Sequence, residues 1–464
     1  MEVIQRTGSR TCICPYTRTR ARLFSSLLRR KPFQIPPYQG RLIPNDEIVD
    51  EEACPGYDSK KFYPARLGEV IANRYQILVK VGWGVSCTVW FARDMRGFRW
   101  QPERAIALKI SNASTQARIN VEREIEEHIA AANPSHPGRG LLRTFSDCFE
   151  VTGPQGGKHL CMAYEPMREP FWIFQKRFRD GLVPLPLLKT YIRILLEGLD
   201  CLHRECKVVH TDLKLDNIMV TFEDPAMLGD IMNSHLEQRS PMDYKIDSTA
   251  AGRHVYRCHN DFGTLRNLRN IPKIVDFGSA NRLDSQNHCG IYPIQPYPYC
   301  APEVILGCGW ETSADIWNFG VLLWDIIPQK ELFRQVRDKE GRYDAKAHLA
   351  EMIALFGPPP PKLIARYHHM RDSKWPKPIK KQEDGKLCTS AGEYFGGPFF
   401  DKDGKYLYED LIPDRKLADT IPSRLLEEGD KEGFLSFVKM MLAWRPEERK
   451  TARELAEHPF LQLR

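Results

Sequence analysis

The strongest chemical signal in the sequence is the segment His210-Thr-Asp212-Leu-Lys214-Leu-Asp-Asn217, which follows the short apolar strand Lys207-Val-Val209. A carboxylate, a lysine two residues later and an asparagine five residues later place three polar side chains around one reaction centre. The carboxylate can act as a base for a hydroxyl, the lysine can stabilise a transferring phosphoryl group, and the amide can bind a metal ion. The pattern therefore predicts phosphoryl transfer, with Asp212, Lys214 and Asn217 as the catalytic residues.

A second acidic position follows a second apolar strand, in Ile274-Val-Asp276-Phe-Gly278. A carboxylate at such a strand end can bind Mg²⁺ that bridges the phosphates. A copy of the motif, Asp261-Phe-Gly263, competes for this role. It is preceded by polar residues rather than by a strand, and it lies 40 residues before Ala301-Pro-Glu303, whereas Asp276 lies 25 residues before it. We therefore assign the metal to Asn217 and Asp276.

A glycine-rich turn, Gly82-Trp-Gly84-Val-Ser-Cys87-Thr-Val89, separates two predicted strands. Glycines let the backbone approach phosphate oxygens closely, so that the N–H groups of the turn can donate to them. An ordinary hairpin turn has the same pattern, and the turn alone does not decide between the two. With the residues that follow, it predicts that Val81, Gly82, Gly84 and Val89 bind a nucleotide.

Lys109 ends the apolar strand Ala105-Ile-Ala-Leu-Lys-Ile110, where an unpaired ammonium would be costly to bury. Glu124, on the helix predicted next, can supply the carboxylate that leaves Lys109 placed to reach two phosphates. Three other glutamates on the same helix are near enough to take the role instead: Glu122, Glu126 and Glu127.

Hydrophobic periodicity predicts the elements that position these residues. Alternating apolar residues from Arg74 onwards predict three strands, and Val121, Ile125 and Ile129 predict one face of a helix over 120–132. Longer helices are predicted over 187–203 and 315–327. The fold class is therefore α+β. The predicted domain, 74–464, has a strand-rich lobe (74–165), a mainly helical lobe (166–464) and an insert (221–270).

Composition excludes several classes of protein. The chain has 464 residues, of which 42% are hydrophobic and 27% charged, which is typical of a globular protein and not of a disordered one. Its longest apolar stretches are far shorter than the roughly 18 residues of a membrane helix. The 13 cysteines include no Cys-x-x-Cys pair, which favours a reduced, intracellular protein without a zinc site.

The charge is concentrated at the N-terminus. Residues 1–45 hold nine Lys/Arg and one acid, which leaves 58 bases and 59 acids in the rest of the chain. The composition of this segment suits either a mitochondrial transit peptide or a disordered basic arm for an acidic partner. Residues 46–73, with several prolines and an acidic run, predict an extended linker.

The motifs occur in the order of the protein-kinase signature set. Residues 74–464 resemble the eukaryotic protein kinases, and most closely the SR-protein kinases in their fungal form. Four features carry this resemblance: the Thr at position 211, Ala301-Pro-Glu-Val-Ile-Leu-Gly307 running into Trp310-Glu-Thr-Ser-Ala-Asp-Ile-Trp-Asn-Phe-Gly320, the segment His348 to Pro358, and the tail Trp444 to Phe460.

The resemblance implies a bilobal kinase fold and transfer of the γ-phosphate of ATP, with Mg²⁺, to serine or threonine of proteins such as Arg/Ser-rich splicing factors. It implies that Glu165 and Met167 belong to the adenine-binding hinge. It also implies that Asp315 and Arg445 are buried supports, with Arg445 paired to Glu303. A cytoplasmic and nuclear monomer that binds neither nucleic acid nor membrane is expected.

Some residues depart from the family pattern and leave alternatives open. Cys87 replaces a glycine or serine, Cys300 replaces an arginine, and Pro296 stands where a threonine is usual. These departures motivate a pseudokinase that serves as a scaffold for a partner. A small-molecule phosphotransferase would share the Asp-to-Asn loop, but not Ala301-Pro-Glu303. In the region 331–351, where acids for an Arg-rich substrate are expected, acidic and basic residues are mixed.

Overall fold

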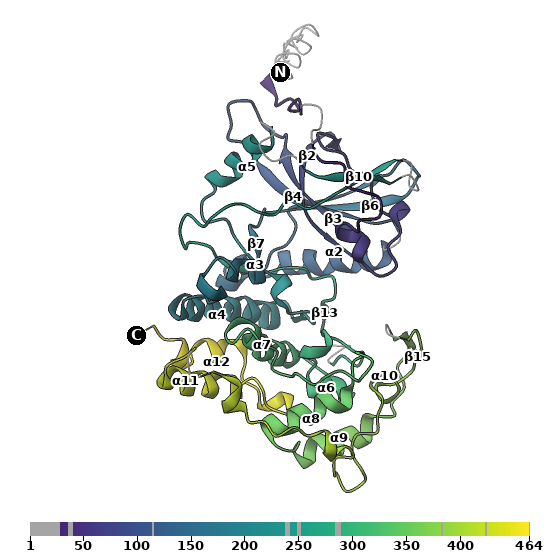
Figure 1. Cartoon of the computed structure of the whole chain (residues 1–464), viewed down its shortest axis with the longest axis vertical. Coiled ribbons are helices and arrows are strands. Elements are labelled where there is room, and N and C mark those ends of the chain that lie inside the picture. Colours follow the sequence, from purple (N-terminus) through teal and green to yellow (C-terminus); the bar gives the residue numbers. More distant parts are fainter. Residues whose placement is uncertain are drawn as a thin grey trace, which may run out of the picture. The chain divides into compact units, whose positions relative to one another are not determined.

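The computed structural model describes residues 28–35, 40–113, 116–236, 242–247, 252–283, 289–381, 384–422 and 425–463. The chain forms two compact units. Unit 1 comprises Met1–Ser114, Asp147–Pro166 and Pro225–Asp261, and unit 2 comprises Thr115–Ser146, Met167–Asp224 and Phe262–Arg464. Unit 1 is rich in strands and unit 2 is mainly helical (Figure 1), so the predicted α+β class is confirmed. Most of the basic N-terminal segment, residues 1–27, lies outside the described residues.

Unit 1 is built on a six-stranded antiparallel sheet in the order β1-β2-β3-β4-β6-β5. The strands are β1 (Val70–Ile71), β2 (Tyr75–Gly84), β3 (Cys87–Asp94), β4 (Ala105–Ser111), β5 (Asp147–Thr152) and β6 (Lys158–Tyr164). Apolar side chains of these strands, among them Ile77, Phe91 and Leu108, are buried in its core. The alternation that predicted three strands therefore marks β2, β3 and β4.

The insert after the catalytic loop also belongs to unit 1, because its residues 225–261 contribute α5 (Ala226–Leu236) and the hairpin of β10 (Tyr244–Asp247) and β11 (Arg253–Tyr256). Residues 46–73 are folded onto the same unit instead of forming an extended linker. They contain 3₁₀ turns at Asp50–Ala53 and Ser59–Lys61, and Val49 and Phe62 are buried.

A buried charge cluster joins these two segments to the sheet. Lys80 of β2 forms an ion pair with Glu51, and its Nζ donates to the carbonyl oxygen of Tyr256 at 2.8 Å. Arg253 pairs with the same glutamate, with 2.6 Å between Nη2 and Oε1. The sequence does not predict this association, because it depends on contacts between residues far apart in the chain.

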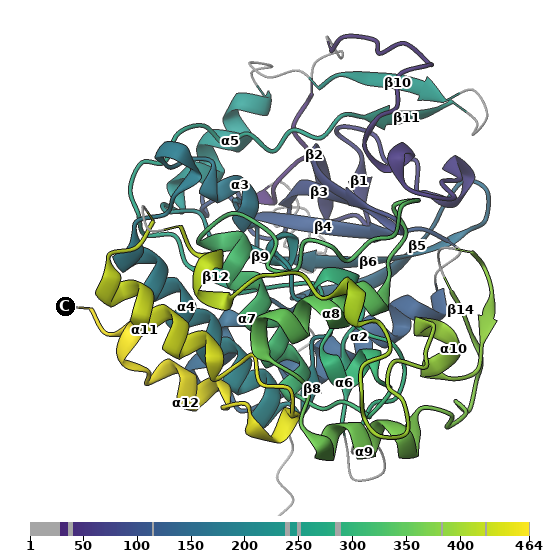
Figure 2. The same cartoon turned by 60° about the horizontal axis from the view of Figure 1, so that its bottom comes forward.

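Unit 2 consists of helices around one apolar core. Its helices are α2 (Gln116–Ala130), α3 (Phe171–Gln175), α4 (Leu185–Asp200), α6 (Pro302–Ile305), α7 (Ser313–Ile326), α8 (Ala345–Phe356), α9 (Pro361–Met370), α10 (Ala391–Phe395), α11 (Glu428–Lys439) and α12 (Ala452–Ala456). Helices α4 and α12 lie side by side (Figure 2). The predicted helices at 187–203 and 315–327 correspond to α4, with the π-turn Cys201–Glu205 that follows it, and to α7.

Helix α2 belongs to unit 2 rather than to the strand-rich unit, because Ile125 and Ile129 pack into the unit 2 core. Short strands complete this unit. β9 (Ile218–Val220) lies between β7 (Glu169–Pro170) and β12 (Pro272–Ile274), β8 (Val208–Val209) pairs with β13 (Asn281–Arg282), and β14 (Ile379–Lys380) pairs with β15 (Leu387–Cys388). Among the described residues, no helix has the length and apolar character needed to cross a membrane.

Candidate active site

The loop between β8 and β9 brings the three predicted catalytic side chains together in unit 2. Lys214 Nζ donates to both carboxylate oxygens of Asp212, at 3.1 and 2.9 Å. Asn217 Nδ2 donates to the same carboxylate at 3.0 Å and to the Asp212 carbonyl oxygen at 2.9 Å. Since the amide nitrogen of Asn217 is engaged in this way, its oxygen Oδ1 is the atom left to act as a metal ligand.

Asp315, in the first turn of α7, fixes the backbone of this loop by hydrogen bonds. Its fully buried carboxylate accepts the backbone N–H groups of His210 at 2.7 Å and Thr211 at 2.9 Å, and it contacts His203 Nε2 at 2.9 Å. Thr211 has a positive φ of 65°. Because two backbone donors converge on one buried carboxylate, the loop keeps a conformation that a β-branched residue seldom adopts. The expected role of Asp315 as a buried support is therefore confirmed.

Asp276 follows β12, directly beside this loop. The backbone N–H of Val275 donates to the Asn217 carbonyl oxygen at 3.0 Å, so the two expected metal ligands come from hydrogen-bonded segments. His210 Nε2 contacts the Val275 carbonyl oxygen at 3.0 Å, and its ring packs on Phe277 with centroids 5.3 Å apart. Carboxylate and amide oxygens suit Mg²⁺, which prefers oxygen ligands.

The glutamate predicted on α2 needs a correction. Glu124 is exposed, whereas Glu122, two residues earlier, is buried at 5% exposure. A Cβ built on Gly278 would lie 3.5 Å from Glu122 Oε2 and 3.3 Å from Asp276 Oδ1. Glu122 is thus the carboxylate of α2 that reaches the segment Asp276-Phe-Gly278, and a glycine at position 278 leaves room for both acids.

In unit 1, register aligns three of the predicted nucleotide-binding positions. Gly82 of β2 is the direct partner of Val89 in β3, and Val89 is the direct partner of Lys109 in β4. Directly opposed residues of an antiparallel sheet project to the same face, so one face carries the glycine turn, the valine and the lysine together. Val81, half-buried, precedes Gly82, and Gly84 pairs with Cys87 at the end of the hairpin.

The two hinge positions differ in their surroundings. Glu165, at the end of unit 1, is exposed, and Met167, at the start of a unit 2 segment, is buried. A hinge of the expected kind forms hydrogen bonds to adenine through its backbone groups. The exposure of the Glu165 side chain is therefore compatible with this role.

A cavity of about 970 Å³ in unit 2 begins at Asp212 and Lys214 and continues along the segment 289–297. Pro296 lies in its wall, and Cys300 lines it from the core. The thiol of Cys300 is buried, which raises its pKa, and Sγ donates to the Ile294 carbonyl oxygen at 3.4 Å. Cys300 is therefore a packing residue and not a reactive thiol.

Glu303 of Ala301-Pro-Glu303 has a different partner from the one expected. Arg449, not Arg445, binds it through two hydrogen bonds of 2.6 Å, and both side chains are fully buried. Arg445 instead pairs with Glu447 and Glu448 at the surface. Both arginines lie in the same tail motif, four residues apart, and the sequence alone does not distinguish them.

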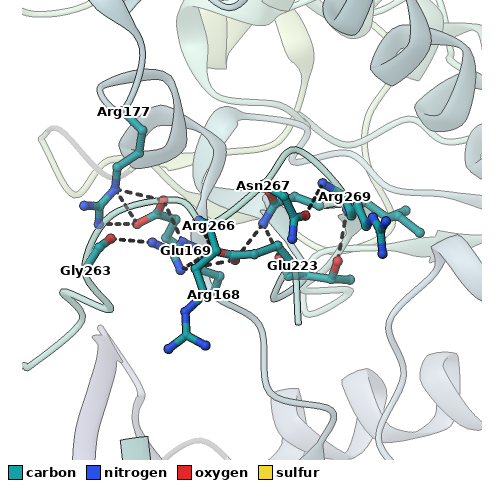
Figure 3. A network of polar contacts seen from close by, with 11 residues as sticks. Arg168, Glu169, Arg177, Glu223, Gly263, Arg266, Asn267 and Arg269 are labelled. Carbon is teal, nitrogen blue, oxygen red and sulfur yellow. Dashed lines mark hydrogen bonds and ion pairs between the residues drawn. The ribbon is translucent and has the colours of Figure 1, made fainter. Parts of the chain in front are cut away.

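A network of buried charges is centred on Arg168 and Glu169, which follow Met167 in the chain (Figure 3). Arg168 is 1% exposed; its Nη1 donates to both Glu223 oxygens at 3.3 and 3.2 Å, and it contacts Glu169 at 3.4 Å. Arg177 donates to the same Glu169 at 2.7 Å. Arg168 also donates to the carbonyl oxygen of Gly263. Gly263 belongs to Asp261-Phe-Gly263, the second copy of the Asp-Phe-Gly motif, which therefore contributes a backbone acceptor to this network.

We expect Arg168→Met to lower the free energy of unfolding by about 2 kcal/mol, because Glu223 then keeps a buried charge without its cation. Glu169 is less affected, since Arg177 remains bound to it. Chemical denaturation of the full chain measures the loss. The double variant Arg168→Met/Glu223→Gln removes the unpaired negative charge and should recover part of the lost free energy of unfolding. A double variant no more stable than Arg168→Met would contradict this explanation.

Three acids surround the Tyr299 hydroxyl: Asp325, Asp216 and Glu331. Asp216 belongs to the loop that carries Asp212 and Asn217. Tyr299 donates its hydroxyl to Asp325 of α7 at 2.5 Å. Burial first, and then the charges of Asp325, Asp216 and Glu331, raise the pKa of Tyr299. The pKa of Asp325 is itself raised to about 6, chiefly by burial. Asp216 and Glu331 are exposed, so this acidic cluster can meet a cation from solvent.

Acids in the region 331–351 are mostly engaged within the protein. Glu351 is buried and paired with Arg415, and Asp338 pairs with Arg342. Asp216 and Asp325 lie outside this mixed region and are far apart in the chain, so the sequence does not reveal that they come together. The position of Asp216, four residues after Asp212, is the signal that was available.

Comparisons with known proteins agree with this geometry. Residues 75–257 and 260–461 match the family described as the protein kinase domain. A serine/threonine protein kinase of Aspergillus fumigatus is 34% identical over 418 residues, which cover 89% of this chain and 91% of that protein. The serine/threonine-protein kinase SRPK of Physarum polycephalum is 29% identical over 431 residues, with 89% and 91% coverage.

Two further matches are more limited. SRSF protein kinase 3 of Mus musculus is 31% identical over 191 residues, which cover 40% of this chain and 32% of that protein. A crystal structure of a kinase domain is 19% identical, with a TM-score of 0.58, and covers 87% of this chain and 100% of that chain. This structural likeness concerns the fold.

Proposed function

This chain belongs to the protein kinase family, and we propose that it is an active serine/threonine kinase that transfers the γ-phosphate of ATP to a protein hydroxyl. The observation that carries the proposal is the constellation around Asp212, whose carboxylate is held by both Lys214 and Asn217. A carboxylate fixed in this way can accept or orient the proton of a substrate hydroxyl.

The other residues divide the remaining tasks. Lys214 stabilises charge on the transferring phosphoryl group, and Lys109 with a glutamate of α2 positions the phosphates. Asn217 and Asp276 would hold Mg²⁺, which neutralises negative charge on the phosphates when bound. On the geometry of unit 2 we assign the α2 role to Glu122.

The scaffold alternative rests on Cys87, Pro296 and Cys300. Cys300 is accounted for as a core residue, and Pro296 has no N–H or side-chain donor that could engage the Asp212 carboxylate, which Lys214 and Asn217 hold. We therefore propose catalysis.

We further propose that the substrate carries arginine near the acceptor serine, as in Arg/Ser-rich proteins. The names of the Physarum and mouse relatives suggest this class. The acidic cluster of Asp216, Asp325 and Glu331 supports it, because it lies beside the catalytic loop and offers carboxylates to a guanidinium.

Phosphate transfer from Mg-ATP to an Arg-Ser repeat peptide, and to the same peptide with citrulline in place of arginine, tests both proposals. We expect Asp216→Asn to raise KM for the arginine peptide about fivefold, as for the loss of about 1 kcal/mol of ion pairing. Glu340→Gln, a matched removal of charge at an exposed site outside the cluster, should leave KM unchanged. Equal KM values for both peptides would contradict the arginine preference and leave the kinase activity intact.

The pKa of Asp325 gives this preference a pH dependence. Because burial raises this pKa to about 6, Asp325 is charged at pH 7.5 and mostly neutral at pH 5. KM for the arginine peptide should therefore rise as the pH falls through 6, while KM for the citrulline peptide stays level. Asp325→Asn should flatten the profile; a profile that is the same in this variant would contradict the assignment.

A further inference from the structure

A cavity of about 550 Å³ lies within unit 1 and is lined by none of the residues assigned to phosphoryl transfer. Three segments that are distant in sequence form it: 59–69 within the folded segment 46–73, 153–159 at the β5–β6 turn, and 252–253 at the start of β11. Small-molecule sites usually have volumes of about 300–1,000 Å³, so a compact organic ligand fits this space.

Most of the wall is apolar. Its apolar members are Phe62, Tyr63, Pro64, Leu67 and Pro154. The Tyr63 ring meets the His159 ring edge-on, with centroids 5.3 Å apart, and the Tyr63 hydroxyl donates to Glu69 at 2.6 Å. These contacts fix the ring in the wall. A ligand here would bury an aromatic or aliphatic body against rigid surfaces.

Inside the wall, one buried cation has an unused donor. Arg253 is 4% exposed; its Nη1 donates to the Tyr57 hydroxyl at 2.7 Å and its Nη2 to Glu51 at 2.6 Å. Its Nε finds no hydrogen-bond partner among the described residues. Buried donors normally have an acceptor, so Arg253 brings a cation whose donors are not all satisfied by the protein to the wall of the cavity.

The rim adds positive charge. Lys60 and Arg66 line the cavity, both are exposed, and neither forms an ion pair within the described part of the chain. Glu69, the acid in the lining, is engaged by Tyr63 and by the backbone N–H of Arg66 at 2.9 Å. The polar part of the cavity therefore favours an anion.

We propose that this cavity binds a small molecule with an aromatic or aliphatic body and one anionic group, a carboxylate or a phosphate. The anion is attracted by the Arg253 guanidinium, Lys60 and Arg66, while the body packs on Phe62 and Tyr63. Since the ligand touches segment 46–73, the β5–β6 turn and the insert, binding also stabilises their association and raises the melting temperature.

Three naphthalene probes test the proposal on the full-length protein: naphthalene-1-carboxylate, 1-naphthyl phosphate and the neutral naphthalene-1-carboxamide. Calorimetric titration is performed with excess ADP, which occupies the nucleotide site of a kinase. We expect one-to-one binding of at least one anion, at least tenfold tighter than that of the carboxamide. The preferred anion separates carboxylate from phosphate ligands. Equal binding of the carboxamide, or no saturable binding of either anion, would overturn the proposal.

Rim variants then locate the site. Lys60→Glu/Arg66→Glu should weaken binding of the preferred anion at least tenfold without changing the melting temperature of the ligand-free protein. Lys61→Glu makes the same kind of charge change at an adjacent exposed residue that does not line the cavity, and it should bind normally. Pro154→Trp, which narrows the cavity from an exposed turn, should also weaken binding. Unchanged affinity in the double variant and in Pro154→Trp would place the ligand elsewhere and contradict the proposal.

Discussion

Asp212→Asn is expected to lower kcat for phosphate transfer by about 10²–10⁴-fold, the usual contribution of a positioned acid or base. Asparagine keeps the size of the side chain and one oxygen that can accept from Lys214 or Asn217, so the loop held by Asp315 should persist. What the variant loses is the negative charge that orients the substrate hydroxyl. Steady-state assays with saturating peptide and Mg-ATP measure the effect.

The control is Asp372→Asn, an identical change at an exposed acid, which should retain kcat. The Kd of ATP for Asp212→Asn, measured by titration calorimetry, should remain within a few-fold of the Kd for the unmodified protein. If Asp212→Asn transferred phosphate at the normal rate, the assignment of this carboxylate would be incorrect.

Arg449→Ala is expected to reduce the free energy of unfolding by about 3–5 kcal/mol, the usual result of removing one partner of a buried ion pair. Arg449 holds Glu303 by two hydrogen bonds and also donates to the carbonyl oxygen of Ser313, the first residue of α7, at 3.0 Å. The alanine variant leaves the Glu303 carboxylate buried without a cation. Urea denaturation followed by circular dichroism measures the change.

Arg445→Ala supplies the matched comparison, because this arginine pairs with Glu447 and Glu448 in a partly exposed position. Its loss should cost less than about 1 kcal/mol, as for other surface pairs. A larger loss for Arg445→Ala than for Arg449→Ala would favour the pairing expected from family resemblance over the observed one.

The catalytic residues could be predicted from the sequence because they are close together in it. Asp212, Lys214 and Asn217 belong to one loop, and Asp276 follows an apolar strand that pairs with the strand after this loop. Local spacing therefore determines the geometry. The same holds for α4, whose apolar residues repeat with the period of a helix over more than three turns, and for α7, whose nearly continuous apolar run is buried on all sides.

The choice among the glutamates of α2 illustrates where local reasoning fails. Val121, Ile125 and Ile129 share a spacing of four, yet Val121 is 49% exposed. The buried face instead runs through Glu122, Ile125, Glu126 and Ile129, a spacing that a helix also supports. Because acids occupy two of these buried positions, a search for apolar residues alone does not reveal that Glu122 belongs to the buried face.

Long-range association is the other part that the sequence does not reveal. Residues 46–73 have the composition of a linker, and the insert interrupts the helical part of the chain, yet both fold onto the sheet of unit 1. Their attachment depends on Lys80, Glu51 and Arg253, which come from three separate regions. Pairing of this kind follows from tertiary contacts and has no periodic signature in the sequence.

The measurement that tests the central claim most directly is mass-spectrometric mapping of an Arg-Ser repeat peptide after incubation with the full-length protein and Mg-ATP. Active transfer predicts phosphoserine in the peptide, formed in proportion to ADP and absent with Asp212→Asn. Tight ATP binding without phosphoserine in this peptide or in a generic serine and threonine acceptor would contradict the account and favour a scaffold.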